Sequence, residues 1–221
     1  MTDHARRCFA AWGEDLVLAY VFQSTEMGRY LDVGCYHPDV SSNTRLLHDR
    51  GWTGVNIDPN PFMIEACRLA RPGDVNLRLA IAGDRGKRPY FVFHEWASSN
   101  TLCEAFAKHI SATQQVDITS RSEVEVVPLV EIMQRYFRDR APDFLNIDVE
   151  DLDSEVLCSN DWNRFRPSVV AVEDFEFRVD APLRSKIYAL LTGHGYKLFS
   201  RTVYTNFFIE TAFNDATHRF A

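Results

Sequence analysis

Acidic residues recur where buried strands are expected to end, and their placement suggests a ligand site. Five such acids would share one edge of a parallel sheet: Asp32, Asp58, Asp148, Glu150 and Glu173. Ionised carboxylates held together repel one another and lose hydration, so a ligand with a cationic centre or hydroxyl donors would stabilise them. The alternative is that each acid caps the helix that follows its strand.

The positions of Gly34 and Asp58 point to a nucleoside. They follow the first two expected strands, the arrangement in which an acid accepts hydrogen bonds from a ribose. A dinucleotide would favour Gly-x-Gly-x-x-Gly, whereas the loop at 34–39 holds one glycine and ends on Asp39. This loop favours a cofactor without phosphates, such as S-adenosylmethionine, over NAD. It therefore counts against a nicotinamide oxidoreductase.

The apolar pattern predicts the elements that would position these side chains. β-branched segments alternate with helical spacing, which indicates an α/β fold with a mostly parallel sheet. The expected strands are 30–33, 54–57, 75–82, 90–93, 124–126, 144–147 and 168–172, with an antiparallel pair at 197–200 and 206–209. Helices are expected at 14–22, from Ser42 or Asn43, and at 62–69, 101–109, 129–137 and 183–191. We expect one domain over 1–221, with the polar segment 95–121 as a lid inserted over the sheet edge.

Composition excludes several classes of protein. The 221 residues include 24 Lys and Arg against 31 Asp and Glu, a formal charge of -7, which argues against a nucleic-acid partner. Five scattered cysteines without a CxxC pair argue against a disulfide framework and a zinc knuckle. The chain shows no apolar run of membrane-spanning length and no signal peptide. We therefore expect a cytoplasmic protein, with oligomerisation left open.

Several motifs, in their order and spacing, resemble the FkbM family of S-adenosylmethionine-dependent methyltransferases. They are Gly13-Glu14-Asp15, Tyr30-Leu31-Asp32-Val33-Gly34, Ser42-Asn43-Thr44, the run from Gly51 to Pro61, Phe144-Leu145-Asn146-Ile147-Asp148-Val149-Glu150, and Glu155-Val156-Leu157. The resemblance implies a class I methyltransferase fold, which is Rossmann-like, with a seven-stranded, mostly parallel sheet and helices on both faces. It also implies O-methylation of a sugar hydroxyl in a saccharide or related natural product.

The resemblance assigns roles to individual residues. The implied cofactor-binding residues are Asp32, Gly34, Tyr36, Asn43, Asp58, Asn60, Ala80 and Ile81. Among them, Asp58 matches the ribose-binding acid, and Ala80 and Ile81 match the lining of the adenine pocket. Asp148 and Glu150 match the family's Asp-x-Glu, where the methyl donor meets its acceptor.

Two positions depart from the usual pattern. Tyr36 stands where class I enzymes commonly have a second glycine, so the loop must be rearranged or the methionine end bound differently. Asp151 replaces the glycine that usually follows the Asp-x-Glu, so the turn after Glu150 is expected to differ. These departures leave open a catalytically inactive methyltransferase-like module that binds a nucleoside or a partner.

Methyl transfer to a hydroxyl requires alignment of the reactants and removal of a proton. The candidate catalytic residues are Asp148, Glu150, His37 and Glu173. In an alternative reading, Asp148 and Glu173 hold Mg²⁺, as in magnesium-dependent O-methyltransferases that act on a diol acceptor. In the expected lid, Trp96 and Phe106 would stack on a sugar ring, or else pack beneath the lid.

Overall fold

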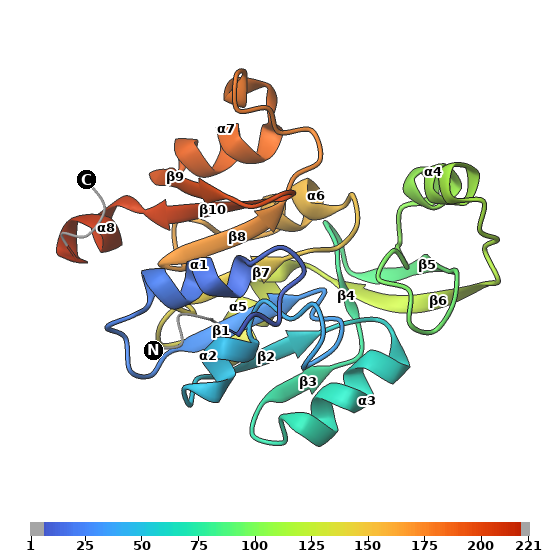
Figure 1. Ribbon diagram of the computed structural model, residues 1–221, viewed down its shortest axis with the longest axis horizontal. Coiled ribbons are helices and arrows are strands. Elements are labelled where there is room, and N and C mark those ends of the chain that lie inside the picture. The colour runs from blue at the N-terminus through green and yellow to red at the C-terminus, as the bar shows by residue number, and fades with distance from the viewer. Residues whose placement is uncertain (1–6, 218–221) are drawn as a thin grey trace, which may run out of the picture.

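The computed structural model describes residues 7–217, and its centre is a seven-stranded sheet (Figure 1). The strands lie in the order β3-β2-β1-β7-β8-β10-β9. Their bounds are β1 Arg29–Val33, β2 Thr53–Ile57, β3 Val75–Leu77, β7 Phe144–Ile147, β8 Val169–Glu173, β9 Tyr196–Arg201 and β10 Thr205–Glu210. The first five of these pair in parallel, whereas β10 runs antiparallel to both β8 and β9. The predicted mostly parallel sheet and the late antiparallel pair are confirmed; the ends of the expected 1–221 domain lie outside the described residues.

Helices cover both faces of this sheet because its strands alternate their side chains. In β7, Leu145 and Ile147 enter a core with α5, α6 and α7, whereas Phe144 enters a second core with α1 and α2. At one end of the sheet, α3 packs against β2 and β3. The helices are α1 Glu14–Val21, α2 Arg45–Asp49, α3 Pro61–Ala70, α4 Glu104–Gln114, α5 Leu129–Tyr136, α6 Asp153–Cys158, the 3-10 turn η1 Pro182–Arg184, α7 Lys186–Gly193 and α8 Thr211–Thr217. Between residues 7 and 217, no helix is long and apolar enough to cross a membrane.

A second, three-stranded sheet projects beside α3 and carries α4 (Figure 1). Its strands are β4 Ala80–Ile81, β5 Gly86–Val92 and β6 Ser120–Val127. The expected single strand 75–82 is therefore wrong: its first part pairs with β2, and its second part leaves the main sheet to pair in parallel with β6.

The segment expected to be an aperiodic lid has a small core of its own. Phe91, Phe93, Ala97, Ala107 and Ile110 pack together and hold α4 against the three-stranded sheet. The predicted helix 101–109 is displaced toward the C-terminus as α4, and the end of the expected lid lies within β6. The segment that leaves the seven-stranded sheet therefore runs from β4 to β6 and begins before residue 95.

The predicted N-cap at Ser42 or Asn43 is wrong. The short helix α2 begins at Arg45. Its N-cap residue is Thr44, whose side chain makes no capping hydrogen bond. The Ser42 hydroxyl instead accepts a hydrogen bond from Arg71, and the Asn43 amide donates to Asn146 at 3.0 Å. These side chains therefore fasten the loop after β1 to the rest of the protein.

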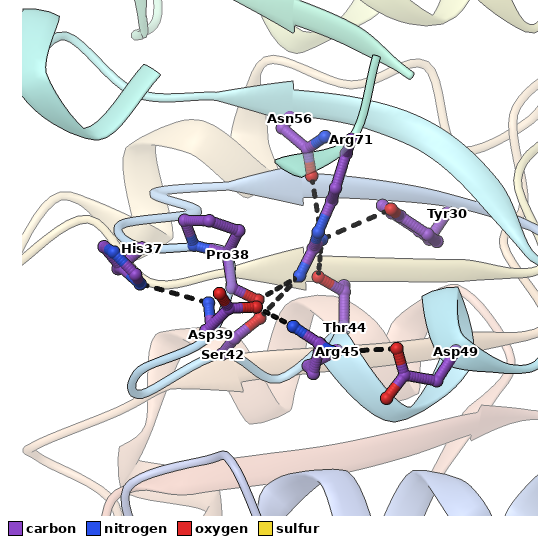
Figure 2. Close-up of polar contacts among 10 residues, drawn as sticks. All are labelled: Tyr30, His37, Pro38, Asp39, Ser42, Thr44, Arg45, Asp49, Asn56 and Arg71. Atoms are coloured by element: carbon purple, nitrogen blue, oxygen red, sulfur yellow. Dashed lines mark hydrogen bonds and ion pairs between the residues drawn. The ribbon is translucent and has the colours of Figure 1, made fainter. Parts of the chain in front are cut away.

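The buried side chain of Arg71, just after α3, is the hub of this attachment (Figure 2). Its guanidinium donates to the carbonyl of Pro38 at 2.6 Å, to the Ser42 hydroxyl at 3.0 Å and to the Thr44 hydroxyl at 2.8 Å. The Thr44 hydroxyl in turn donates to Asp32 at 2.7 Å. A carboxylate buried at the end of β1 and a cation buried beside α3 are thus joined through one hydroxyl.

We predict that Arg71→Met lowers the free energy of unfolding by about 3 kcal/mol or more, because it leaves buried acceptors and a buried carboxylate without their cation. Denaturation with urea measures the change. Arg68→Met is the matched control, since Arg68 lies near the end of α3, which Arg71 follows, in an exposed ion pair with Glu65, and it should contribute less than about 0.5 kcal/mol. Equal stabilities of the two variants would contradict the role of Arg71.

Candidate functional site

A cavity lies at the carboxyl ends of β1, β2 and β7, where a parallel sheet binds its ligands. Its empty volume is about 880 Å³, a value that includes space open to solvent. The structure brings together in its wall all eight residues expected to bind a cofactor: Asp32, Gly34, Tyr36, Asn43, Asp58, Asn60, Ala80 and Ile81. Their individual roles remain predictions.

Asp58, at the end of β2, is oriented by backbone groups. Its two carboxylate oxygens accept hydrogen bonds from the backbone N–H of Tyr36 at 3.0 Å and of Asn60 at 2.8 Å. Burial nevertheless raises the pKa of Asp58 to about 7, and the charges of Asp32 and Asp148 act in the same direction. Each oxygen keeps acceptor capacity for a further donor, such as a ligand hydroxyl.

Part of the cavity wall is apolar. Ile57, Met63 and Leu79 line it next to Ala80 and Ile81. Two buried polar residues of the segment from β4 to β6, Tyr90 and Asn100, also line the cavity. Sequence reasoning missed both, because their segment lacked a clear pattern; an Asn in a stretch that otherwise packs was the available clue.

Gly34 allows the ends of β1 and β7 to approach closely. It has φ 78°, and a Cβ built on it would lie 1.7 Å from the carbonyl oxygen of Asp148. Any side chain here would separate the two strands that carry Asp32 and Asp148. The close approach of the Asp148 backbone therefore explains why residue 34 is a glycine, without reference to a ligand.

Both departures from the family pattern occur at residues with left-handed backbone. Tyr36 has φ 49°, and Glu150 and Asp151 have φ 58° and 80°. Such conformations cost side-chain-bearing residues on the order of 1–3 kcal/mol and persist only where neighbouring contacts enforce them. The Tyr36 hydroxyl donates to the Trp96 carbonyl at 2.8 Å, and the Glu150 carbonyl accepts from Thr101 at 2.9 Å. The loops therefore keep a glycine-like conformation without glycine.

A second cavity adjoins the first. Asp148 and Glu150 line both cavities, as do Ser41, Asn43 and Ser98. Glu173, at the end of β8, lines the second cavity and not the first. Three of the four expected catalytic residues are therefore gathered where the cavities meet or just beyond.

The carboxyl groups in this region hold protons strongly. Burial raises the pKa of Asp148 to about 7, of Glu150 to about 9 and of Glu173 to about 11. Neighbouring negative charges add to the effect: Asp32 and Glu14 act on Asp148, and Asp148 acts on Glu150 and Glu173. Asp148 and Glu173 are hydrogen-bonded to each other, which requires a proton between them. With a pKa of about 7, the carboxyl group of Asp148 is only partly ionised at neutral pH.

His37 lies apart from this group. It is not among the residues that line either cavity, and its Nδ1 accepts a hydrogen bond from the backbone N–H of Asp39 at 3.1 Å (Figure 2). Burial lowers the pKa of His37, so the imidazole is neutral near pH 7. These contacts orient the loop after β1 and give no support to His37 as the base.

Asp32 is held from within the protein. Besides Thr44, it accepts a hydrogen bond from the side chain of Asn146 at 2.9 Å, and Asn146 in turn accepts one from Asn43. Asn146 was missed as a site residue, although an asparagine in the middle of a buried strand was a usable indication. Arg71 gave no such indication, because an arginine at the end of an amphipathic helix is usually exposed.

A metal centre is not evident among the described side chains, where no three His, Cys, Asp or Glu residues are grouped so as to hold an ion. Of the two aromatic residues expected to meet an acceptor, Phe106 lines the second cavity, whereas Trp96 lines neither.

Comparison with known proteins agrees with the motifs. The family model described as "Methyltransferase FkbM domain" matches residues 32–198, about three quarters of the chain. Among solved structures, the chain is similar to a TehB-like SAM-dependent methyltransferase from Corynebacterium glutamicum, with 11% identity, a TM-score of 0.44, and 90% of this chain and 88% of that chain covered. None of the curated proteins gives a significant match. Because the family model covers about three quarters of the chain, the chain belongs to the FkbM family of methyltransferases.

Proposed function

We propose that the protein is an S-adenosylmethionine-dependent O-methyltransferase that acts on a hydroxyl of a saccharide or related polyol. The observation that carries this proposal is the placement of Asp148 and Glu150, which line both cavities at once. One cavity would hold the methyl donor and the other the acceptor. Two carboxyl groups would then stand where the two reactants meet.

The first cavity suits the donor in shape and chemistry. Asp58 offers a carboxylate for the two ribose hydroxyls, and the apolar wall around Ala80 and Ile81 suits an adenine ring. Acidic side chains in the wall of this cavity suit the positively charged ammonium and sulfonium groups of the methionine portion. The described part of the wall contains no lysine or arginine, as fits a cofactor without phosphates.

S-adenosylmethionine supplies a methyl carbon on a positively charged sulfur: transfer breaks the C–S bond, forms a C–O bond and releases the hydroxyl proton. In our proposal Asp148 accepts this proton, because it adjoins both cavities. Burial raises the pKa of Asp148 to about 7, so it is partly ionised near neutral pH, and its hydrogen bond with Glu173 orients the carboxylate. Glu150 orients the acceptor from the other side.

A magnesium-dependent reaction on a diol is the second candidate, favoured by the pairing of Asp148 and Glu173. In that case the two carboxylates would hold the ion, and the ion would hold two acceptor oxygens. Loss of methyl transfer on addition of EDTA, restored by Mg²⁺, would select this candidate over the metal-free one.

We predict that Asp58→Ala weakens the binding of S-adenosylhomocysteine at least about tenfold, since each charge-assisted hydrogen bond contributes ~1.5–3 kcal/mol. Calorimetric titration measures the affinity. Glu65→Ala, on the exposed surface of α3, should bind like the wild type. Unchanged affinity in a folded Asp58→Ala protein would remove Asp58 from the site and weaken the nucleoside assignment.

The raised pKa of Asp58 predicts a pH-dependent affinity. Ribose hydroxyls donate to the ionised carboxylate, and with a pKa of about 7 the free protein is only partly ionised near neutrality. Binding of S-adenosylhomocysteine should therefore tighten from pH 6 to pH 8 and release protons, which titrations in buffers of different ionisation enthalpy detect. Asp58→Asn should bind with less dependence on pH; the same dependence in both proteins would assign it to another group.

We predict that Asp148→Asn lowers kcat about 100-fold or more on a verified acceptor, because it removes the base while keeping the shape of the side chain. The affinity for S-adenosylhomocysteine should change by no more than a few-fold. Asp180→Asn, an exposed residue paired with Arg178, serves as the control. Near-wild-type turnover of Asp148→Asn would show that Asp148 is structural.

A further inference from the structure

The second cavity has an aromatic wall. Trp12, Phe106, Phe175 and Tyr204 contribute to it from four separate segments of the chain. Phe175 contacts both Tyr204 and Phe106, with ring centroids 5.3 and 5.9 Å apart, and Trp12 contacts Tyr204 at 6.3 Å. Trp12, Phe175 and Tyr204 remain 57%, 43% and 41% exposed. A cluster of partly exposed rings inside a concave site offers ring faces to a ligand.

The same cavity carries an unbalanced set of acids. Asp148, Glu150 and Glu173 line it, and none of the three forms an ion pair with a described lysine, arginine or histidine. The Oε2 atom of Glu173 is buried and has no hydrogen-bond partner among the residues described. Buried acceptors of this kind are costly unless a ligand satisfies them.

Two further acids, Glu14 and Asp151, line this cavity, and Glu14 is already satisfied within the protein. Glu14 accepts hydrogen bonds from the backbone N–H of Trp12 at 2.8 Å and from the Thr202 hydroxyl at 2.5 Å. It therefore orders the aromatic wall, whereas Asp148, Glu150 and Glu173 are left for a ligand.

The nearby cations are directed elsewhere. No described lysine or arginine lines the cavity. Among the described residues of its wall, His109 is the one with a basic side chain. Arg201 feels the charge of Glu173, but its guanidinium donates to Asn206 and to the carbonyl of Asp174. Lys186 lies along a neighbouring groove that Glu173 also borders. The charge of the acids is thus not matched by the protein within the cavity.

We propose that the acceptor carries a protonated amine next to the hydroxyl that is methylated, as in an amino sugar or amino alcohol. This inference rests on the proposed methyltransferase function and specifies its substrate class. The positive charge of the ammonium would favour ionisation of Glu173 and Glu150, which would then accept its hydrogen bonds, and the ammonium would lie against the faces of the aromatic wall. A phosphate or carboxylate on the acceptor would gain no such attraction and would keep protons on these acids.

An ammonium group at this position also assists the proton transfer. A positive charge one carbon away lowers the pKa of the acceptor hydroxyl, so Asp148 removes its proton more readily. It also offsets the repulsion that holds protons on the neighbouring carboxyl groups. Substrate recognition and base formation would then depend on the same charge.

Calorimetric titration of the whole protein with matched probes tests the inference, with and without S-adenosylhomocysteine. The probes are glucosamine, galactosamine and mannosamine, each compared at pH 6.5 with its N-acetyl form and with the parent sugar. At least one amine should bind about tenfold more tightly than its two partners. Failure of every amine to bind, or binding of the N-acetylated or parent sugar as tightly as the corresponding amine, would overturn the proposal.

Two variants locate the selectivity. Glu173→Gln keeps the size and the hydrogen bond to Asp148, so it should reduce the preference for the amine about fivefold or more while leaving S-adenosylhomocysteine binding unchanged. Glu176→Gln, the same change on an exposed residue of the same loop that lies outside the cavity, should keep the full preference. Equal preference in both variants would overturn the assignment to Glu173.

The two proposals fail in different ways. If S-adenosylhomocysteine does not bind, the methyltransferase proposal fails, whereas the preference for the amine is still measured on the protein alone. If it binds and labelled methyl groups are transferred only to acceptors without an amine, the amine proposal fails alone. Acceptor binding that requires Mg²⁺ and ignores the amine would also overturn it, in favour of a metal in the acid cluster.

Discussion

Carboxyl groups crowd one edge of the sheet, and much of the surrounding polar structure offsets the cost of burying them. Each acid is stabilised differently. Asp32 accepts from a hydroxyl that is itself bonded to Arg71, Asp58 accepts two backbone N–H groups, and Asp148 and Glu173 share a proton. The loops that form both cavities are held by these same bonds. The fold and the site therefore depend on one electrostatic constraint.

The sequence was sufficient for the main sheet and for the residues that gather at its edge. Buried parallel strands are continuous apolar runs, and each ends at a conspicuous polar residue such as Asp58 or Glu173, so the strands and the shared edge were both predictable. The helix expected at 62–69 is present as α3, which begins at Pro61 because proline is tolerated in the first turn of a helix. Asp148 and Glu150 were placed correctly at the edge because the strand before them is short and uninterrupted.

Features that depend on distant contacts were not predictable. The segment 75–82 reads as one strand, yet Ala80 and Ile81 leave the main sheet because β6, some 40 residues later, offers a partner. Arg71 looks like an ordinary residue at the end of a surface helix until the fold brings it to Thr44 and Asp32. His37 is next to the site in sequence, but it is not among the residues that line either cavity. Sequence proximity gave no information on where these side chains point.

The two cavities differ in what builds them. The first consists largely of strand ends and the turns that follow them, whereas the aromatic wall of the second comes from connections and from α4, none of which pairs within the seven-stranded sheet. Substitutions at Trp12, Phe175 or Tyr204 alter partly exposed side chains and leave the strand register and both main cores intact. During evolution, acceptor preference can thus diverge at low cost in stability, while the strand ends that form the first cavity stay unchanged.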